Sequence, residues 1–260
     1  MSKVVSKDGT TIAYDRRGDG PALVLVDGAL CSRAQGPLPD LAEQLASEFT
    51  VYNYDRRGRG DSGDQAEYDV EREIEDLAAV IEAAGGSAYV YGTSSGAALT
   101  LRAAAAGLPI TRVVAFEPPY VVDDSRKPIP RTWVSDLNAL DPGDAVKYFM
   151  TKGIGLPGFV VALMKLMPGW KGMKAVAHTL PYDATLLGEN CFGQPLDASQ
   201  WASIDQPVLV VNGGKSPRWM KTSVRALGSA VPGAKHEEVP GQNHMIKASA
   251  IAPVISGFLH

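Results

Sequence analysis

Residues 87–107 read SAYVYGTSSGAALTLRAAAAG: a short apolar run, two serines between glycines, and an alanine-rich stretch. The first part predicts a strand over 87–92, and the last part predicts a helix over 95–107. The G-x-S-x-G motif between them is typical of a strand that turns sharply into a helix, because glycine tolerates the close contacts of such a turn. Ser94 is centred between the glycines and is the candidate nucleophile, ahead of its neighbour Ser95. The alternative is a glycine-rich turn without chemistry.

The same alternation of strands and helices continues outward from this turn in both directions. The expected strands are apolar throughout, which is typical of a parallel sheet covered by helices on both faces. Residues 3–17 instead predict an antiparallel hairpin with its turn at KDG, residues 7–9. The sequence therefore predicts an α/β fold. Its further strands are expected at 22–28, 49–55, 110–117, 207–214 and 235–239, with helices around 38–45 and at 70–85, 219–231 and up to Phe258.

The regular alternation stops between residues 118 and 203. We expect this stretch to be a helical cap or lid inserted between two parts of one core domain, residues 1–117 and 204–260. Within it, PGFVVALMKLM (157–167) has helical spacing but is too short and too interrupted to cross a membrane. We expect its apolar run at 158–164 to pack in the core or to line a pocket; docking on a membrane is the alternative.

Composition excludes several classes of protein. The chain has 260 residues, 45% of them hydrophobic and 21% charged, so it can bury one large core. Its net charge of −4 provides no basic surface for nucleic acid or for an anionic membrane, and we expect neither partner. The N-terminus lacks the apolar stretch of a signal peptide, which predicts a cytoplasmic protein. The cysteines, Cys31 and Cys191, are too few for a disulfide framework or a cysteine-rich metal site, and both are expected to be apolar fillers.

Four ordered segments resemble motifs of the α/β-hydrolase superfamily, and the resemblance covers nearly the whole chain. It implies an α/β-hydrolase fold with a mostly parallel central sheet and a helical cap, and a serine nucleophile followed in the chain by an acid and a histidine base. His244 is the best placed of the histidines, because His178 lies in the expected cap, His236 in the last strand, and His260 at the chain end. The four segments are VDGALCS (26–32), YDRRGRGDSGD (54–64), GTSSG (92–96) and GQNH (241–244).

The position of the acid departs from the family pattern. In the family an aspartate commonly follows the strand that corresponds to PVLVVNGG, but Ser216 stands there. Glu117, at the end of the preceding strand, is held on a stiff segment by the two prolines that follow it, and some relatives resemble this arrangement. Glu117 is therefore the candidate acid. Asp123 and Asp124 remain alternatives, as does a solvated Glu117 without a role in catalysis.

The resemblance also implies an oxyanion hole built from backbone N–H groups, with Ala29 and Ser95 as candidates. Asp27 replaces the family's usual histidine before Gly28, and its carboxylate is either structural or in contact with substrate. Three arginines follow the next strand. We expect them to brace the neighbouring loop together with Asp55 and Asp61, rather than to bind phosphate; they are Arg56, Arg57 and Arg59.

These residues favour an esterase-like serine hydrolase. We expect it to cleave a small to medium carboxylic ester, thioester or lactone whose acyl part is apolar, without a metal or organic cofactor. Two alternatives stay open: a biosynthetic lyase or cyclase on the same fold, and a ligand-binding protein on a hydrolase scaffold. Oligomeric state cannot be read from the sequence.

Overall fold

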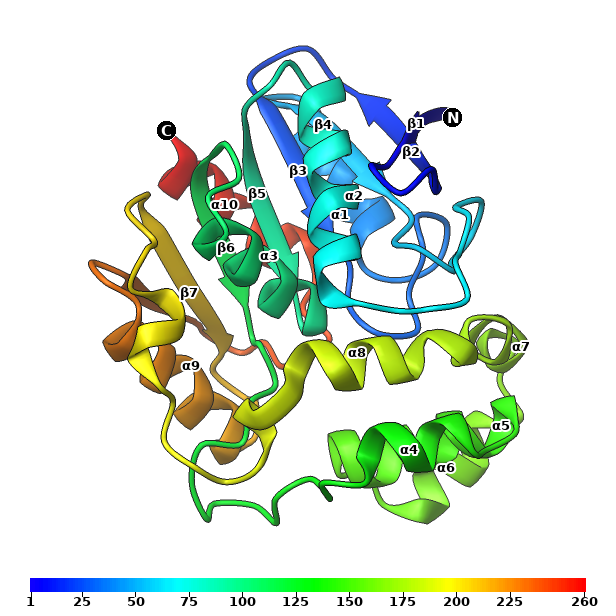
Figure 1. Ribbon diagram of the computed structural model, residues 1–260. Coiled ribbons are helices and arrows are strands. Elements are labelled where there is room, and N and C mark those ends of the chain that lie inside the picture. The colour runs from blue at the N-terminus through cyan, green and yellow to red at the C-terminus, as the bar shows by residue number, and fades with distance from the viewer.

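The computed structural model describes residues 1–260, and its centre is an 8-stranded sheet in the order β1-β2-β4-β3-β5-β6-β7-β8 (Figure 1). Strand β2 is antiparallel to both β1 and β4, whereas all other neighbouring strands are parallel. The predicted hairpin and the predicted mostly parallel sheet are thus confirmed. The strands are β1 (Ser2–Val5), β2 (Thr11–Arg17), β3 (Ala22–Val26), β4 (Thr50–Tyr54), β5 (Ala88–Thr93), β6 (Ile110–Phe116), β7 (Val208–Gly213) and β8 (Lys235–Val239).

Helices cover both faces of this sheet. Helices α1 (Leu38–Leu45) and α10 (Ala248–Leu259) pack against each other on one face, and their apolar side chains share a core with the strands. On the other face lie α2 (Val70–Ala83), α3 (Ser95–Ala105) and α9 (Arg218–Ala230). The arrangement follows from strands that are apolar on both sides and must be shielded from water on both. It confirms the predicted fold class.

Residues 118–203 add no strand to the sheet and form short helices near the carboxyl ends of the parallel strands (Figure 1). Helix α8 (Leu180–Leu187) contacts α2 and α3 of the core, and α4 (Trp133–Asn138) packs on α8. The role of this segment as a cap, with boundaries at 118 and 203, stays a prediction. Its other helices are α5 (Pro142–Tyr148), η1 (Phe149–Ile154), α6 (Gly158–Met164), α7 (Gly169–Ala175), η2 (Ala177–Thr179), η3 (Gly188–Cys191) and η4 (Ala198–Trp201).

The expectation that the apolar run at 158–164 packs in the core or lines a pocket is wrong for most of the run. Val161 is fully buried, but Phe159 is 70% exposed and Leu163 is 62% exposed. The prolines at 157 and 168 bound the segment, and α6 has only 7 residues, so just one side of a short helix reaches the interior. No helix of the protein is both long and apolar enough to cross a membrane.

Candidate active site

The register of the sheet brings three strand ends together at one edge. Thr93 of β5 pairs with Phe116 of β6, which pairs in turn with Val211 of β7. The next residues continue this ladder, because the Ser94 N–H donates to the Phe116 carbonyl at 2.9 Å and the Glu117 N–H donates to the Val211 carbonyl at 3.0 Å. Ser94 and Glu117 therefore leave adjacent strands side by side.

Ser94 occupies a strained turn between β5 and α3. Its φ of 56° and ψ of −126° are unusual for a residue other than glycine. The turn depends on small neighbours: a Cβ on Gly96 would lie 2.3 Å from the Val26 carbonyl oxygen, and a Cβ on Gly28 would lie 2.9 Å from the Ser94 Cβ. Ser94 is half-buried, and its hydroxyl makes no hydrogen bond to another protein group. This hydroxyl is therefore available to react with a ligand.

His244 is held by the carboxylate of Glu117. The His244 Nδ1 and the Glu117 Oε2 are 2.7 Å apart, and the other carboxylate oxygen accepts a 2.8 Å hydrogen bond from the Gly213 N–H. Glu117 is fully buried, whereas the His244 side chain is 25% exposed. The imidazole also stacks on the ring of Phe116, with 6.2 Å between the ring centroids. Its Nε2 makes no hydrogen bond within the protein and remains available to Ser94 or to a ligand.

The other candidate acids do not contact His244. Asp123 accepts hydrogen bonds from Ser125, which follows it in the same loop, and Asp124 is exposed. At the position where the family commonly has its aspartate, the Ser216 hydroxyl is buried without a partner. The strand end next to Ser216 instead contributes the Gly213 N–H that binds Glu117.

Both amides predicted to form an oxyanion hole lack a protein acceptor. Ser95 is the first residue of α3, where N–H groups have no partner inside the helix, and the Ala29 N–H donates to no protein group. Arg59 Nη1 donates to the Gly28 carbonyl at 2.6 Å. In a trans peptide the C=O and the following N–H point in opposite directions, so this contact fixes the direction of the Ala29 N–H.

A buried group of charges lies beneath this loop. Arg56 forms a bidentate pair with Glu73, with both contacts at 2.6 Å, and its Nη1 is 2.7 Å from Asp183 Oδ1. Arg59 binds the other oxygen of Asp183 at 2.7 Å, and the Ser95 hydroxyl donates to Asp183 Oδ1 at 2.7 Å. Burial raises the pKa of Asp183, but the two guanidiniums outweigh it and lower the pKa below its ordinary value. Asp183 is therefore a carboxylate that ties α8 to the turn after Ser94.

Sequence reasoning did not identify this charged group. The motif DRRGRGD signals the arginines, but their partner Asp183 lies 124 residues from Arg59 in the chain. No local spacing marks an aspartate in a helix of the expected cap as the partner of two distant arginines. Only the fold brings them together.

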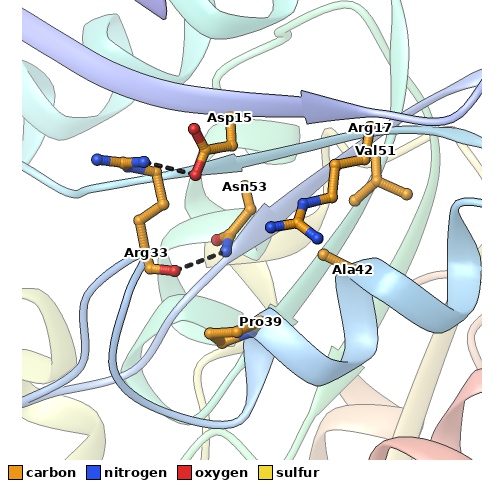
Figure 2. A pocket seen from close by; sticks show the side chains of 7 residues that line it. All are labelled: Asp15, Arg17, Arg33, Pro39, Ala42, Val51 and Asn53. Atoms are coloured by element: carbon orange, nitrogen blue, oxygen red, sulfur yellow. Dashed lines mark hydrogen bonds and ion pairs between the residues drawn. The ribbon is translucent and has the colours of Figure 1, made fainter. Parts of the chain in front are cut away.

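Arg56 and Arg59 hold the neighbouring loop through the carbonyls of Asp27 and Gly28. Asp55 and Asp61 bind Arg33 at that loop rather than the three arginines. Asp55 Oδ1 accepts from the Arg33 N–H at 2.6 Å, and Asp61 is 2.5 Å from its guanidinium. Figure 2 shows Arg33 beside a small hollow, with its side chain reaching Asp15 and its carbonyl accepting from Asn53. Arg33 thus anchors the outer end of the loop that carries Ala29. None of the candidate catalytic residues lines this hollow.

No group of three or more His, Cys, Asp or Glu side chains is arranged to hold a metal ion. The thiols of Cys31 and Cys191 are unpaired, and burial raises the pKa of both. Neither thiol is therefore in the reactive thiolate form at neutral pH.

A family model described as "Alpha/beta hydrolase family" matches residues 28–250. The chain belongs to the α/β hydrolase family. An α/β hydrolase from Sphaerobacter thermophilus, known from its crystal structure, is 52% identical over 100% of both chains, with a TM-score of 0.93.

Two further similarities are more limited. An N-formylmaleamate deformylase of Pseudomonas putida is 37% identical over 120 residues, which is 44% of this chain and 44% of that protein. The match thus spans less than half of the length of this relative. An enol-lactonase of Burkholderia xenovorans is 19% identical over 99% of both chains, with a TM-score of 0.70, and shares the fold.

Asp27 of this hydrolase carries a buried carboxyl group next to the oxyanion candidates. Its Oδ1 accepts a hydrogen bond from the Gly28 N–H at 2.8 Å, whereas its Oδ2 is buried without a partner against Gly36. Burial raises the pKa of Asp27 to about 7, although the Gly28 N–H and the charges of Arg59 and Arg56 oppose the shift. Below about pH 7 this carboxyl is therefore mostly neutral and does not oppose negative charge on a nearby oxygen.

The first prediction concerns Asp183. Asp183→Ala leaves two buried guanidiniums without their shared partner, and we expect the free energy of unfolding to fall by about 3–5 kcal/mol. Urea unfolding followed by circular dichroism measures the change. The control Asp205→Ala removes the same charge from an exposed side chain that binds no other group, and should change stability little. Equal effects of the two variants would contradict the bridging role of Asp183.

The second prediction follows from the raised pKa of Asp27. Between the unfolded pKa of about 3.9 and the folded value of about 7, the folded protein keeps a proton that the unfolded chain has lost. Stability contributed by Asp27 therefore falls as pH rises through this range, by up to about 4 kcal/mol, and is constant above it. Asp27→Asn should remove this dependence, because an amide does not titrate.

The measurement for Asp27 is the free energy of unfolding of both proteins at pH values from 4 to 8. We expect the wild-type value minus the Asp27→Asn value to decrease between about pH 4 and pH 7. A difference that is independent of pH would show that Asp27 is ionised in the folded hydrolase across this range.

Proposed function

We propose that this α/β hydrolase is a serine hydrolase that cleaves a small to medium carboxylic ester, thioester or lactone through an acyl-enzyme. The observation that carries the proposal is the 2.7 Å contact between His244 Nδ1 and the buried Glu117 carboxylate, at the sheet edge where Ser94 follows β5. A nucleophile after β5, an acid after β6 and a histidine base in the loop after β8 are the three groups that acyl transfer by a serine requires.

The catalytic role of each residue follows from which of its atoms already make hydrogen bonds and which do not. Glu117 accepts a hydrogen bond from the Nδ1–H of His244, which leaves Nε2 unprotonated; Nε2 can then take the proton of the Ser94 hydroxyl as the oxygen attacks the substrate carbonyl. The imidazolium then gives this proton to the leaving group. Water, activated in the same way, attacks the acyl-serine and releases the acid. Glu117 stays ionised throughout and stabilises the imidazolium.

The developing negative charge on the substrate oxygen is met by the N–H groups of Ala29 and Ser95. Arg59 keeps the first of these in place through the Gly28 carbonyl, and the dipole of α3 adds to the second. Donors that are fixed before the reaction cost no reorganisation when the charge appears.

The acyl group is assigned an apolar character, because the helices of residues 118–203, near the carboxyl ends of the parallel strands (Figure 1), are rich in apolar side chains. The name of the Pseudomonas putida relative, a deformylase, is in keeping with acyl transfer to water. The proposal needs no cofactor.

The third prediction tests the nucleophile. A fluorophosphonate probe should label the wild-type protein, and a panel of p-nitrophenyl esters of short and medium acyl length should show turnover. Ser94→Ala should abolish labelling and turnover while the protein stays folded, and His244→Ala should lower turnover almost as much, because members of such a triad act as a unit. Turnover retained in Ser94→Ala would remove it as the nucleophile. Absence of labelling in the wild type would favour a lyase, a cyclase or a ligand-binding protein.

The fourth prediction tests the acid. Glu117→Gln preserves the shape of the side chain but removes its charge, and we expect kcat to fall by on the order of 10²- to 10⁴-fold. The matched control is Ser216→Ala at the neighbouring strand end, where the hydroxyl binds nothing and the rate should change little. Wild-type kcat in Glu117→Gln would exclude Glu117 as the acid.

A further inference from the structure

The outer surface of α6 and of the turn after it exposes large apolar side chains beside lysines. Phe159 is 70% exposed, Leu163 62%, Leu166 84% and Met167 61%, and these are four of the eight large hydrophobic residues that the protein exposes. Exposed apolar side chains gathered in one place mark an interaction surface. We call this surface the α6 patch and define it by these four residues together with Lys165 and Lys171, which are also exposed.

The segment of the chain that carries the α6 patch differs in charge from the whole chain. Residues 145–182 contain five lysines and no aspartate, glutamate or arginine, although the chain as a whole has a net charge of −4. None of these lysines forms an ion pair, since the lysine ion pairs of the protein involve Lys7 and Lys221. Lys165 lies over the ring of Trp170, with its Nζ 5.7 Å from the ring centroid, and keeps its charge at the surface. The patch thus combines apolar surface with uncompensated positive charge.

We propose that the α6 patch docks the protein on the surface of an anionic lipid bilayer. The apolar side chains enter the boundary between headgroups and acyl chains, while Lys165 and Lys171 extend their aliphatic stems and place their ammonium groups among the lipid phosphates. Such binding requires no helix that spans the membrane. It reverses the sequence-based expectation of no membrane partner, which was drawn from net charge and from the length of apolar runs.

The composition of the α6 patch favours a lipid surface over a protein. Lysine is depleted in protein–protein interfaces, because its strongly hydrated ammonium group is costly to bury there. At a bilayer the ammonium stays hydrated among headgroups, and each lysine contributes about 1 kcal/mol of attraction to an anionic surface. Leu166, between the short helix and Pro168, is 84% exposed, so its side chain can enter a headgroup layer.

The α6 patch belongs to the helices at the bottom of Figure 1, whereas β1 is the outermost strand of the sheet and lies near the top, well away from α6. Docking through α6 therefore keeps the hairpin away from the membrane. This inference is independent of the proposed hydrolysis, because it concerns binding and names no catalytic residue.

The test is sedimentation of the full-length protein with vesicles. We expect binding to vesicles of phosphatidylcholine that contain phosphatidylglycerol, little binding to phosphatidylcholine alone, and a decrease in binding as salt is added. The double variant Leu166→Ser with Lys165→Glu should bind the anionic vesicles about tenfold more weakly or worse. Its hydrolysis of soluble esters should match that of the wild type.

A matched control makes the same chemical changes on the hairpin. Lys3 and Val5 are exposed, Val5 by 67%, and Lys3→Glu with Val5→Ser should leave vesicle binding unchanged. Equal losses in both double variants would show a non-specific charge effect and overturn the proposal. It would also be overturned if the wild type failed to bind anionic vesicles at low salt. A concentration-dependent dimer in light scattering that the α6 variant abolishes, without vesicle binding, would assign the patch to a second copy of the chain.

Discussion

The carboxylate of Asp183 joins the helices of residues 118–203 to the core, because it pairs with Arg56 and Arg59. Arg56 and Arg59 are fully buried behind the turn after Ser94, and an unpaired guanidinium in such a place is strongly destabilising. Asp183 reaches them from α8: Arg56 also has Glu73 of the core as a partner, but Asp183 is the carboxylate that pairs with Arg59, so the core does not neutralise Arg59 without residues 118–203. The contact therefore links the position of α8 to the loop and turn at the active site.

Backbone strain is concentrated where chemistry is proposed. The non-glycine residues with positive φ in this protein are Leu30, Ser94 and Glu117. Leu30 follows one oxyanion candidate in the chain, Ser94 is the proposed nucleophile, and Glu117 is the proposed acid. Conformations of this kind cost of order 1–3 kcal/mol each and persist where surrounding contacts hold them. Here the contacts are the strand-end hydrogen bonds of Ser94 and Glu117 and the arginines beneath the loop.

Much of the fold could be predicted from local patterns, because apolar strands, helical spacing and glycine-flanked turns each depend on residues that are close together in the sequence. The candidacy of Ser94, His244 and Glu117 came from motif order together with the missing aspartate at Ser216. Asp183 could not be predicted, because its partners are distant in the chain and no motif marks it. The exposure of α6 was also missed: an apolar run with helical spacing has the same letters whether it faces the core or the solvent, and only the packing of the other helices decides between them.

The account as a whole depends on a covalent bond to Ser94. The most direct measurement is the intact mass of the protein, quenched in acid within the first turnovers of a p-nitrophenyl ester, followed by peptide mapping of any adduct. The account predicts a mass increase equal to one acyl group, located on the peptide that contains Ser94, which decays as the ester is consumed. Steady turnover without an adduct, or an acyl group on Cys31 or another residue, would contradict it.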